Sequence, residues 1–215
     1  RGRQDSAVYF DASFGNHFLN ITTRGHAGTR QIFGDAVTFF LSQCAVFHRR
    51  HDLTVRVFAR MKRAMADEDY MRIALQEAQA ASIRGEVPVG AVLVNPETQQ
   101  IIARTGNAPI GICDPTAHAE ILALRDGAHE TGNYRLTGFD LYVTLEPCTM
   151  CAGAISNARI GRVIYGASDP KGGAVESGVR FFDQPSCHHR PDILGGILAD
   201  ESAAMLKAFF KARRK

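Results

Sequence analysis

The chain has 215 residues, of which 45% are hydrophobic and 22% charged, and it carries a formal net charge of +3 without any tryptophan. This composition is typical of a globular protein of one or two domains that can bury a sizeable core. No apolar run reaches the roughly 18 residues that a spanning helix needs, which excludes a membrane-spanning protein. Five cysteines are too few, and odd in number, for a disulfide scaffold, so thiols or metal ligation are favoured.

The excess of positive over negative charge is confined to the first third of the chain. Residues 1–66 hold ten Lys and Arg against four Asp and Glu, a balance of +6, whereas residues 67–215 hold fifteen against eighteen, a balance of −3. A basic chain favours nucleic-acid binding, but here the excess lies outside the more regular part of the sequence. The net charge is therefore a poor guide to a partner.

Residues 1–66 contain none of the eight Pro and eight of the thirteen Phe, without a clean periodicity. Three interpretations fit this segment: an Arg-rich, acid-poor targeting segment, an added arm that binds a partner or RNA, or translated upstream sequence before a start at Met61 or Met65. The composition favours the last of these. We predict an unassigned N-terminal extension over 1–66 and one domain over 67–215.

From Asp67 the pattern becomes regular. Three acidic residues open a segment whose apolar residues recur at helical spacing up to Ala81, and Gly85 is a typical stop. The continuous apolar run Val87–Val94 predicts a strand buried on both faces. A turn sequence follows, and Gln100–Arg104 is predicted to pair with the first strand as a hairpin.

The remainder alternates helices and strands. The predicted helices are Ala117–Glu130, Cys148–Asn157 and Asp200–Arg213, and the predicted strands are Asp140–Thr144 and Arg162–Tyr165. This alternation indicates a single layered α/β domain.

Two short motifs each open a predicted helix. In Glu146-Pro-Cys-Thr-Met-Cys, Cys148 and Cys151 are three positions apart, so on a helix their side chains lie within roughly 60° of each other and can face one metal ion. The helix N-terminus favours the thiolate that a metal requires. Alone, this pair also fits half of a structural zinc site, a redox pair or two buried thiols.

The other motif is Thr116-Ala-His-Ala-Glu. His118 and Glu120 are two positions apart, roughly 200° around an ideal helix, so both can serve one centre only if it lies beyond the helix start. A lone histidine is more often a satisfied core or surface residue. One His and two Cys together, however, make the three-ligand set of catalytic zinc, which leaves Glu120 as a carboxylate free to act as general acid and base.

His-x-Glu followed by Pro-Cys-x-x-Cys is the signature of the zinc-dependent nucleobase deaminases. Within that superfamily the chain resembles the bacterial tRNA-specific adenosine deaminases over about residues 68–214. The resemblance is carried by Glu86–Val92, Asn107–Gly111, Asp114–Glu120, Asn133–Leu136, Leu145–Ala152, Arg159–Gly166 and Gly196–Glu201.

The resemblance implies a three-layer α/β/α, cytidine-deaminase-like domain with a central mixed sheet of about five strands. It implies a cytoplasmic homodimeric hydrolase that binds one Zn²⁺ per subunit. The substrate that the resemblance implies is the anticodon stem-loop of a tRNA, chiefly an arginine tRNA, whose wobble adenosine would be converted to inosine. An alternative is a sister enzyme on the same fold that deaminates free guanine, cytidine or dCMP. A protein that only binds RNA, with zinc as a structural staple, is a further alternative.

Site residues follow from motif position in the family. His118, Cys148 and Cys151 would bind zinc and Glu120 would move the proton, while Asn107 and Asp169 would contact the flipped base and the substrate ribose. Two departures concern the RNA contacts: the stretch from Asn95 to Thr105 is slightly longer than usual, and Ile112-Cys113 replaces more polar residues.

Overall fold

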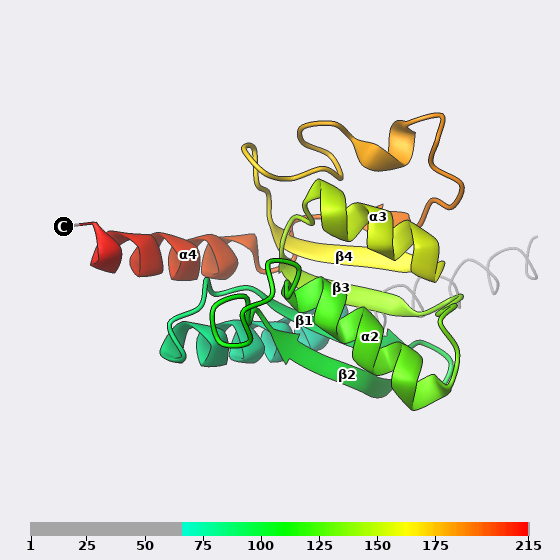
Figure 1. The fold of residues 1–215 in the computed structure, drawn as a ribbon, viewed down its shortest axis with the longest axis horizontal. Coiled ribbons are helices and arrows are strands. Elements are labelled where there is room, and N and C mark those ends of the chain that lie inside the picture. Colours follow the sequence, from blue (N-terminus) through cyan, green and yellow to red (C-terminus); the bar gives the residue numbers. More distant parts are fainter. Residues whose placement is uncertain (1–65, 215) are drawn as a thin grey trace, which may run out of the picture. The chain divides into compact units, whose positions relative to one another are not determined.

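The computed structural model describes residues 66–214 (Figure 1). The extension predicted over 1–66 lies, apart from its last residue, outside the described residues. The described elements are a helix over residues 66–83, β1 (Gly90–Asn95), β2 (Gln100–Gly106), α2 (Ala119–Thr131), β3 (Asp140–Leu145), α3 (Thr149–Ala158), β4 (Arg162–Ala167), a 3-10 turn η1 (Phe181–Asp183), β5 (Asp192–Leu194) and α4 (Ala199–Arg213). No helix of this part of the chain is long and apolar enough to cross a membrane.

The strands form one mixed sheet in the order β2-β1-β3-β4-β5. β1 pairs antiparallel with β2, which confirms the predicted hairpin, and antiparallel with β3 on its other side. β3, β4 and β5 run parallel. The pattern did not indicate β5, because its three residues, Asp192–Leu194, are too few to show a periodicity.

Helices cover both faces of the sheet. Ala91 and Leu93 of β1 belong to one buried cluster, which α2 and α3 complete, whereas Val92 and Val94 point into a second cluster with Met71 from the helix over residues 66–83. Figure 1 shows α2 and α3 together on one face and the first helix, in cyan, on the other. The predicted three-layer α/β/α fold is therefore confirmed.

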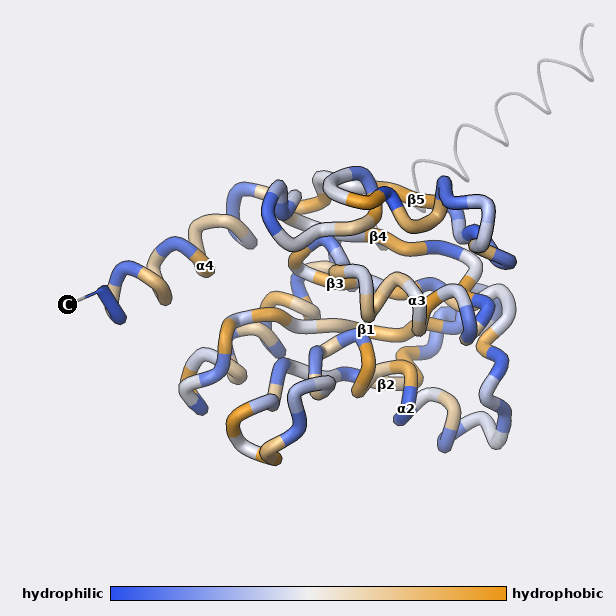
Figure 2. Tube along the Cα trace, turned by 45° about the horizontal axis from the view of Figure 1, so that its top comes forward, coloured by the Kyte–Doolittle hydropathy of each residue, from blue (hydrophilic) through white to orange (hydrophobic). Residues whose placement is uncertain are grey.

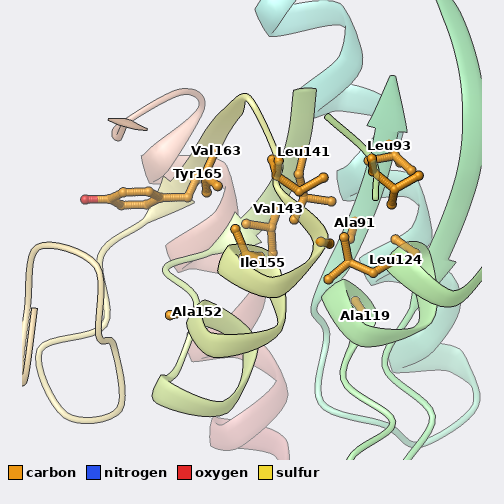
Figure 3. Packing of buried hydrophobic residues seen from close by; sticks show 14 of the residues in the cluster. Ala91, Leu93, Ala119, Leu124, Leu141, Val143, Ala152, Ile155, Val163 and Tyr165 are labelled. Atoms are coloured by element: carbon orange, nitrogen blue, oxygen red, sulfur yellow. The ribbon is translucent and has the colours of Figure 1, made fainter. Parts of the chain in front are cut away.

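The cluster under α2 and α3 fixes the position of these two helices. Leu124 of α2 and Ile155 of α3 lie over the buried side chains of β1, β3 and β4 (Figure 3). On the opposite face α4 approaches β4 closely, since a Cβ on Gly166 would lie 2.4 Å from Ser202 Oγ. Beyond this contact α4 projects past the sheet, with polar and apolar residues alternating along it (Figure 2).

Two local expectations change in the structure. The strand predicted from Val87 begins at Gly90, because Val89 N–H donates to Val87 O across Pro88, at 2.8 Å, in a three-residue turn. Asp67 does more than place charge at a helix start: its side chain is 4% exposed, and its carboxylate pairs with Arg162 at 2.9 Å.

Candidate metal and catalytic site

The two motifs meet where α2 and α3 begin. His118 and Cys148 are the residues directly before these helices, and both have extended backbone, with ψ of 150° and 174°. Cys151 lies in the first turn of α3. Because α2 and α3 pack side by side on the sheet, their N-terminal ends present the three side chains to one point. His118 therefore lies directly before α2, which is the position that its spacing from Glu120 requires if both residues serve one centre.

Three ligand atoms form a nearly equilateral triangle. His118 Nδ1 lies 3.7 Å from Cys148 Sγ and 3.6 Å from Cys151 Sγ, and the two sulfur atoms are 3.6 Å apart. Tetrahedral zinc, with Zn–S of about 2.3 Å and Zn–N of about 2.0 Å, separates its ligand atoms by about 3.5 to 3.8 Å. Within residues 66–214 this is the group of side chains that can hold a metal ion, and its donor set and spacing fit zinc.

Hydrogen bonds within the triangle prepare the sulfur atoms for a metal. The pKa of Cys148 is lowered to about 4, first by its hydrogen bond with Cys151 and then by that with His118, against the effect of burial. The same contact, together with burial, raises the pKa of Cys151. The hydrogen bond with Cys148 raises the pKa of His118. One thiol is thus favoured as a thiolate, and a metal held by these residues would displace the proton of the other thiol.

Glu120 lies in the first turn of α2, two residues after His118. Its side chain is 3% exposed, and its Oε2 has no hydrogen-bond partner among the described residues. Burial raises the pKa of Glu120 above its ordinary value. A buried carboxyl oxygen without a partner is costly, so this atom is suited to a water or substrate group next to the three ligand atoms.

Asn107 directly follows β2 and is buried, with 6% exposure. Its Oδ1 accepts a hydrogen bond from Ala119 N–H at 2.8 Å, and its own N–H donates to Val89 O at 2.9 Å. Within the described residues no protein group accepts a hydrogen bond from its Nδ2. The amide thus holds the start of α2 beside His118 and keeps a donor for another group.

Asp169 follows β4 and does not join the ligand triangle. Its Oδ1 accepts the N–H groups of Lys171 at 3.1 Å and Gly172 at 3.0 Å, which closes a turn. The loop that it begins nevertheless lies against the site, because Gly173 pairs with Cys148 in an antiparallel bridge. The loop that contains Asp169 thus contacts Cys148, whereas the carboxylate of Asp169 itself closes the turn.

The sequence pattern did not assign a role to Glu146, which precedes Pro147 and Cys148. Its carboxylate is 2% exposed and accepts four backbone N–H groups and one hydroxyl from the loop after β4. Burial opposes its ionisation, but the hydrogen bonds, that of Ser177 N–H first, outweigh it and lower the pKa of Glu146. The only local signal is an acidic residue at the end of a buried strand.

Comparison with known proteins agrees with this geometry. Residues 64–167 match the family model described as the cytidine and deoxycytidylate deaminase zinc-binding region. The chain is 58% identical over 145 residues to a tRNA-specific adenosine deaminase of Agrobacterium fabrum, covering 67% of this chain and 94% of that protein. It is 43% identical over 149 residues to a tRNA-specific adenosine deaminase of Bacillus subtilis, covering 69% and 91%.

Solved structures show the same relationship. A structure from a study of A-to-I editing by tRNA:A34 deaminases at the wobble position is 59% identical, with a TM-score of 0.63 over 64% of this chain and 99% of that chain. A guanine deaminase from Nitrosomonas europaea has a TM-score of 0.59 over 66% and 83% of the two chains, but at 20% identity it shares the fold alone. The zinc-ligand triangle, the buried carboxylate and the extent of these matches show that this chain belongs to the family of tRNA-specific adenosine deaminases.

Proposed function

We propose that this chain converts the wobble adenosine of a tRNA anticodon, chiefly that of an arginine tRNA, to inosine by zinc-dependent hydrolysis. The observation that carries the proposal is the buried Glu120 Oε2, without a partner among the described residues, beside the triangle of His118, Cys148 and Cys151. The identity of 58% to a tRNA-specific adenosine deaminase supports this substrate. Because tRNA is used in the cytoplasm, the same similarity supports a cytoplasmic location for the protein.

His118 Nδ1 and the sulfur atoms of Cys148 and Cys151 would hold one Zn²⁺ per subunit. When bound, zinc supplies a Lewis acid that makes water a nucleophile at neutral pH. A set of three protein ligands is typical of catalytic zinc, whereas structural zinc sites usually have four. Residues 67–215 contain every group of this site, so we assign the activity to that domain.

Glu120 would move the protons of the reaction through Oε2. Its carboxylate takes a proton from the attacking water and delivers it to the ring nitrogen of adenine, and a second transfer helps the exocyclic amine leave as ammonia. Burial, which raises the pKa of Glu120, suits a group that must both accept and return a proton. The product carries a carbonyl at the attacked carbon and is inosine.

Asn107 and Asp169 would bind the substrate. A stacked base hides its reacting carbon, so the adenosine must turn out of the anticodon loop into the site. Asn107 keeps its Nδ2 for an acceptor on that base, while Ala119 N–H holds its Oδ1. Asp169, at the start of the loop over Cys148, would lie near the ribose.

We propose that the enzyme acts as a homodimer through the face formed by α2 and α3. A groove of about 820 Å³ runs along these helices and is lined by Ile121, Leu124, Tyr134 and Met150 among others. Tyr134 is 67% exposed and Met150 37% exposed. Large apolar side chains gathered beside a groove on one face are typical of an interaction surface.

The test compares substrates. Zinc-loaded protein is incubated with an arginine tRNA that carries adenosine at the wobble position, and in parallel with free guanine, cytidine and dCMP. We expect inosine at the wobble position and no turnover of the free compounds. If the tRNA is inert while a free base or nucleotide is deaminated, the sister-enzyme alternative replaces this proposal. If zinc is bound and none of these substrates turns over, a protein that only binds RNA is favoured.

A further inference from the structure

The carboxylate of Glu146 is the centre of a hydrogen-bond cluster under the loop that follows β4. Oε2 accepts from Asp169 N–H at 2.9 Å and from Ser177 Oγ at 2.8 Å. Oε1 accepts from the N–H groups of Val175, Glu176 and Ser177, at 3.2, 2.9 and 2.7 Å. A buried carboxylate is costly unless such donors surround it, so this side chain and both ends of the loop depend on each other.

The loop lies in direct contact with the segment that carries the ligand Cys148. Ala174 N–H donates to Pro147 O at 2.9 Å, and Gly173 forms a bridge with Cys148. A Cβ on Gly173 would lie 2.5 Å from Glu146 Cδ, so the loop backbone rests on the carboxylate. One short segment, residues 146–148, thus fixes both a metal ligand and the position of the loop relative to that ligand.

The other loop beside the site has a similar support. Glu86 is 3% exposed and accepts from Gly111 N–H at 2.7 Å and from Ile110 N–H at 3.3 Å. This loop begins at Asn107, and the loop after β4 includes Asp169. Each loop therefore carries one of the two residues proposed to bind the substrate. Glu86 is therefore a matched comparison for Glu146: the same residue type, equally buried, holding a different loop through backbone N–H groups.

We infer that Glu146 is a positioning residue for the tRNA: it holds the loop over residues 168–178 at a fixed place against Cys148 and thereby sets the surface on which the anticodon rests. This inference rests on the proposed function for the identity of the substrate. Glu146 is not one of the three side chains that can hold a metal ion, and its carboxylate is occupied by donors of the loop. Its effect reaches the substrate through Asp169 and the exposed Lys171, which the loop presents next to the site.

Hydrogen exchange of the zinc-loaded full chain tests the support directly. Glu146→Gln puts an amide NH₂ where backbone N–H groups need an acceptor, so the amides of Asp169 and Val175–Ser177 should exchange at least about tenfold faster than in the wild type. Amides within α2 and α3 should be unchanged. Glu86→Gln should instead affect the amides of Ile110 and Gly111. Wild-type exchange at the amides of 169 and 175–177 in Glu146→Gln would overturn the inference.

Kinetics test the consequence for the substrate. In Glu146→Gln we expect the KM for tRNA to rise about tenfold or more while kcat changes less than about threefold and bound zinc equals that of the wild type. A fall in kcat with an unchanged KM, or loss of zinc, would overturn a positioning role. If the wild type forms no inosine, the proposed function fails by itself, and the exchange experiment still decides whether Glu146 supports the loop.

Ser177→Ala tests the same cluster if Glu146→Gln does not fold. It removes one hydroxyl donor of the cluster and leaves the carboxylate and the backbone donors in place. The expected result is a smaller change in the same direction, with KM raised about threefold and kcat unchanged. An unchanged KM in a folded Ser177→Ala protein would contradict the inference.

Discussion

The burial of Glu120 costs stability but suits the proton transfer that we propose for this residue. Its carboxyl group is buried in the first turn of α2, and Oε2 has no partner among residues 66–214. Folding alone gives no reason to keep such an atom away from water, since the desolvation cost is not repaid. The proton transfer proposed for Glu120, beside the three side chains that can hold a metal ion, gives that reason.

Glu120→Ala is expected to retain zinc and lose at least about a hundredfold in the rate of inosine formation, since general acid–base groups contribute roughly 10²- to 10⁴-fold. The three ligand atoms belong to His118, Cys148 and Cys151 and are unchanged by the substitution. Zinc content and single-turnover inosine formation are measured on the same preparation. Turnover equal to that of the wild type would show that another group moves the proton.

Among single residues, the three candidate metal ligands can be predicted from the sequence, whereas the hydrogen bonds around them cannot. Cys148, Cys151 and His118 stand at motif spacings, and each was expected at a helix start, where the structure has them. The role of Glu146 was not predicted, because its donors are 23 to 31 positions away. Contacts of that separation depend on the fold of the loop after β4, which has no periodic pattern.

At the scale of elements, close approach between helices and the sheet depends on glycines. Gly90 opens β1, and a Cβ there would lie 2.0 Å from Ala74 O and 2.5 Å from Ala78 N. Both of these atoms belong to the backbone of the helix over residues 66–83. The helix can lie at its observed distance from β1 only if no side chain stands at this position, which hydrophobic periodicity alone does not reveal.

Gly90→Ala is therefore expected to lower the free energy of unfolding by about 1–3 kcal/mol, the typical cost of overpacking a well-packed core. Gly153→Ala is the matched control: its Cβ would meet only Phe181 Cζ, at 3.9 Å, and it lies inside α3, where alanine is favoured over glycine. Urea unfolding of both variants measures the difference. Equal stability of the two would contradict the packing argument.

The elements themselves were largely predictable, and their ends were less so. Long amphipathic or continuous apolar segments such as β3 and α4 were indicated within one or two residues of their observed bounds. The predicted start of β1 at Val87 is wrong because the chain turns at Pro88 before the strand begins at Gly90. The pattern does not indicate β5, because this strand is short and lies in a loop-rich segment. In both cases local backbone geometry or tertiary pairing overrides the hydrophobic pattern.

At the scale of the whole domain, the two ends of the parallel strands have different roles. Cys148 and Asp169, to which we assign metal binding and substrate binding, come after the carboxyl ends of β3 and β4. The first residues of the same strands, Asp140 and Arg162, form an ion pair at 2.8 Å, and Arg162 also pairs with Asp67 of the first helix. Buried charges thus join the helix to the sheet at the end remote from the chemistry.

Tyr142 connects this cluster to the pH dependence of stability. Its hydroxyl donates to Asp67 at 2.6 Å, and burial, followed by that hydrogen bond and the nearby carboxylates, raises the pKa of Tyr142 above 10. The folded domain therefore holds the phenolic proton more tightly than the unfolded chain. The stability that this proton contributes is fully present below the unfolded pKa of about 10 and is lost as the pH rises above it.

Tyr142→Phe removes both the hydrogen bond and the titration. Near pH 7 the variant is expected to be less stable than the wild type by about 1–3 kcal/mol, because Asp67 loses a donor. Above pH about 10 this difference should shrink by up to about 1.4 kcal/mol per pH unit. Tyr165, whose pKa burial and Glu176 also raise, is present in both proteins, so the difference isolates Tyr142. Urea unfolding between pH 7 and 11 measures it, and a difference that stays constant across this range would show that Tyr142 does not couple stability to pH.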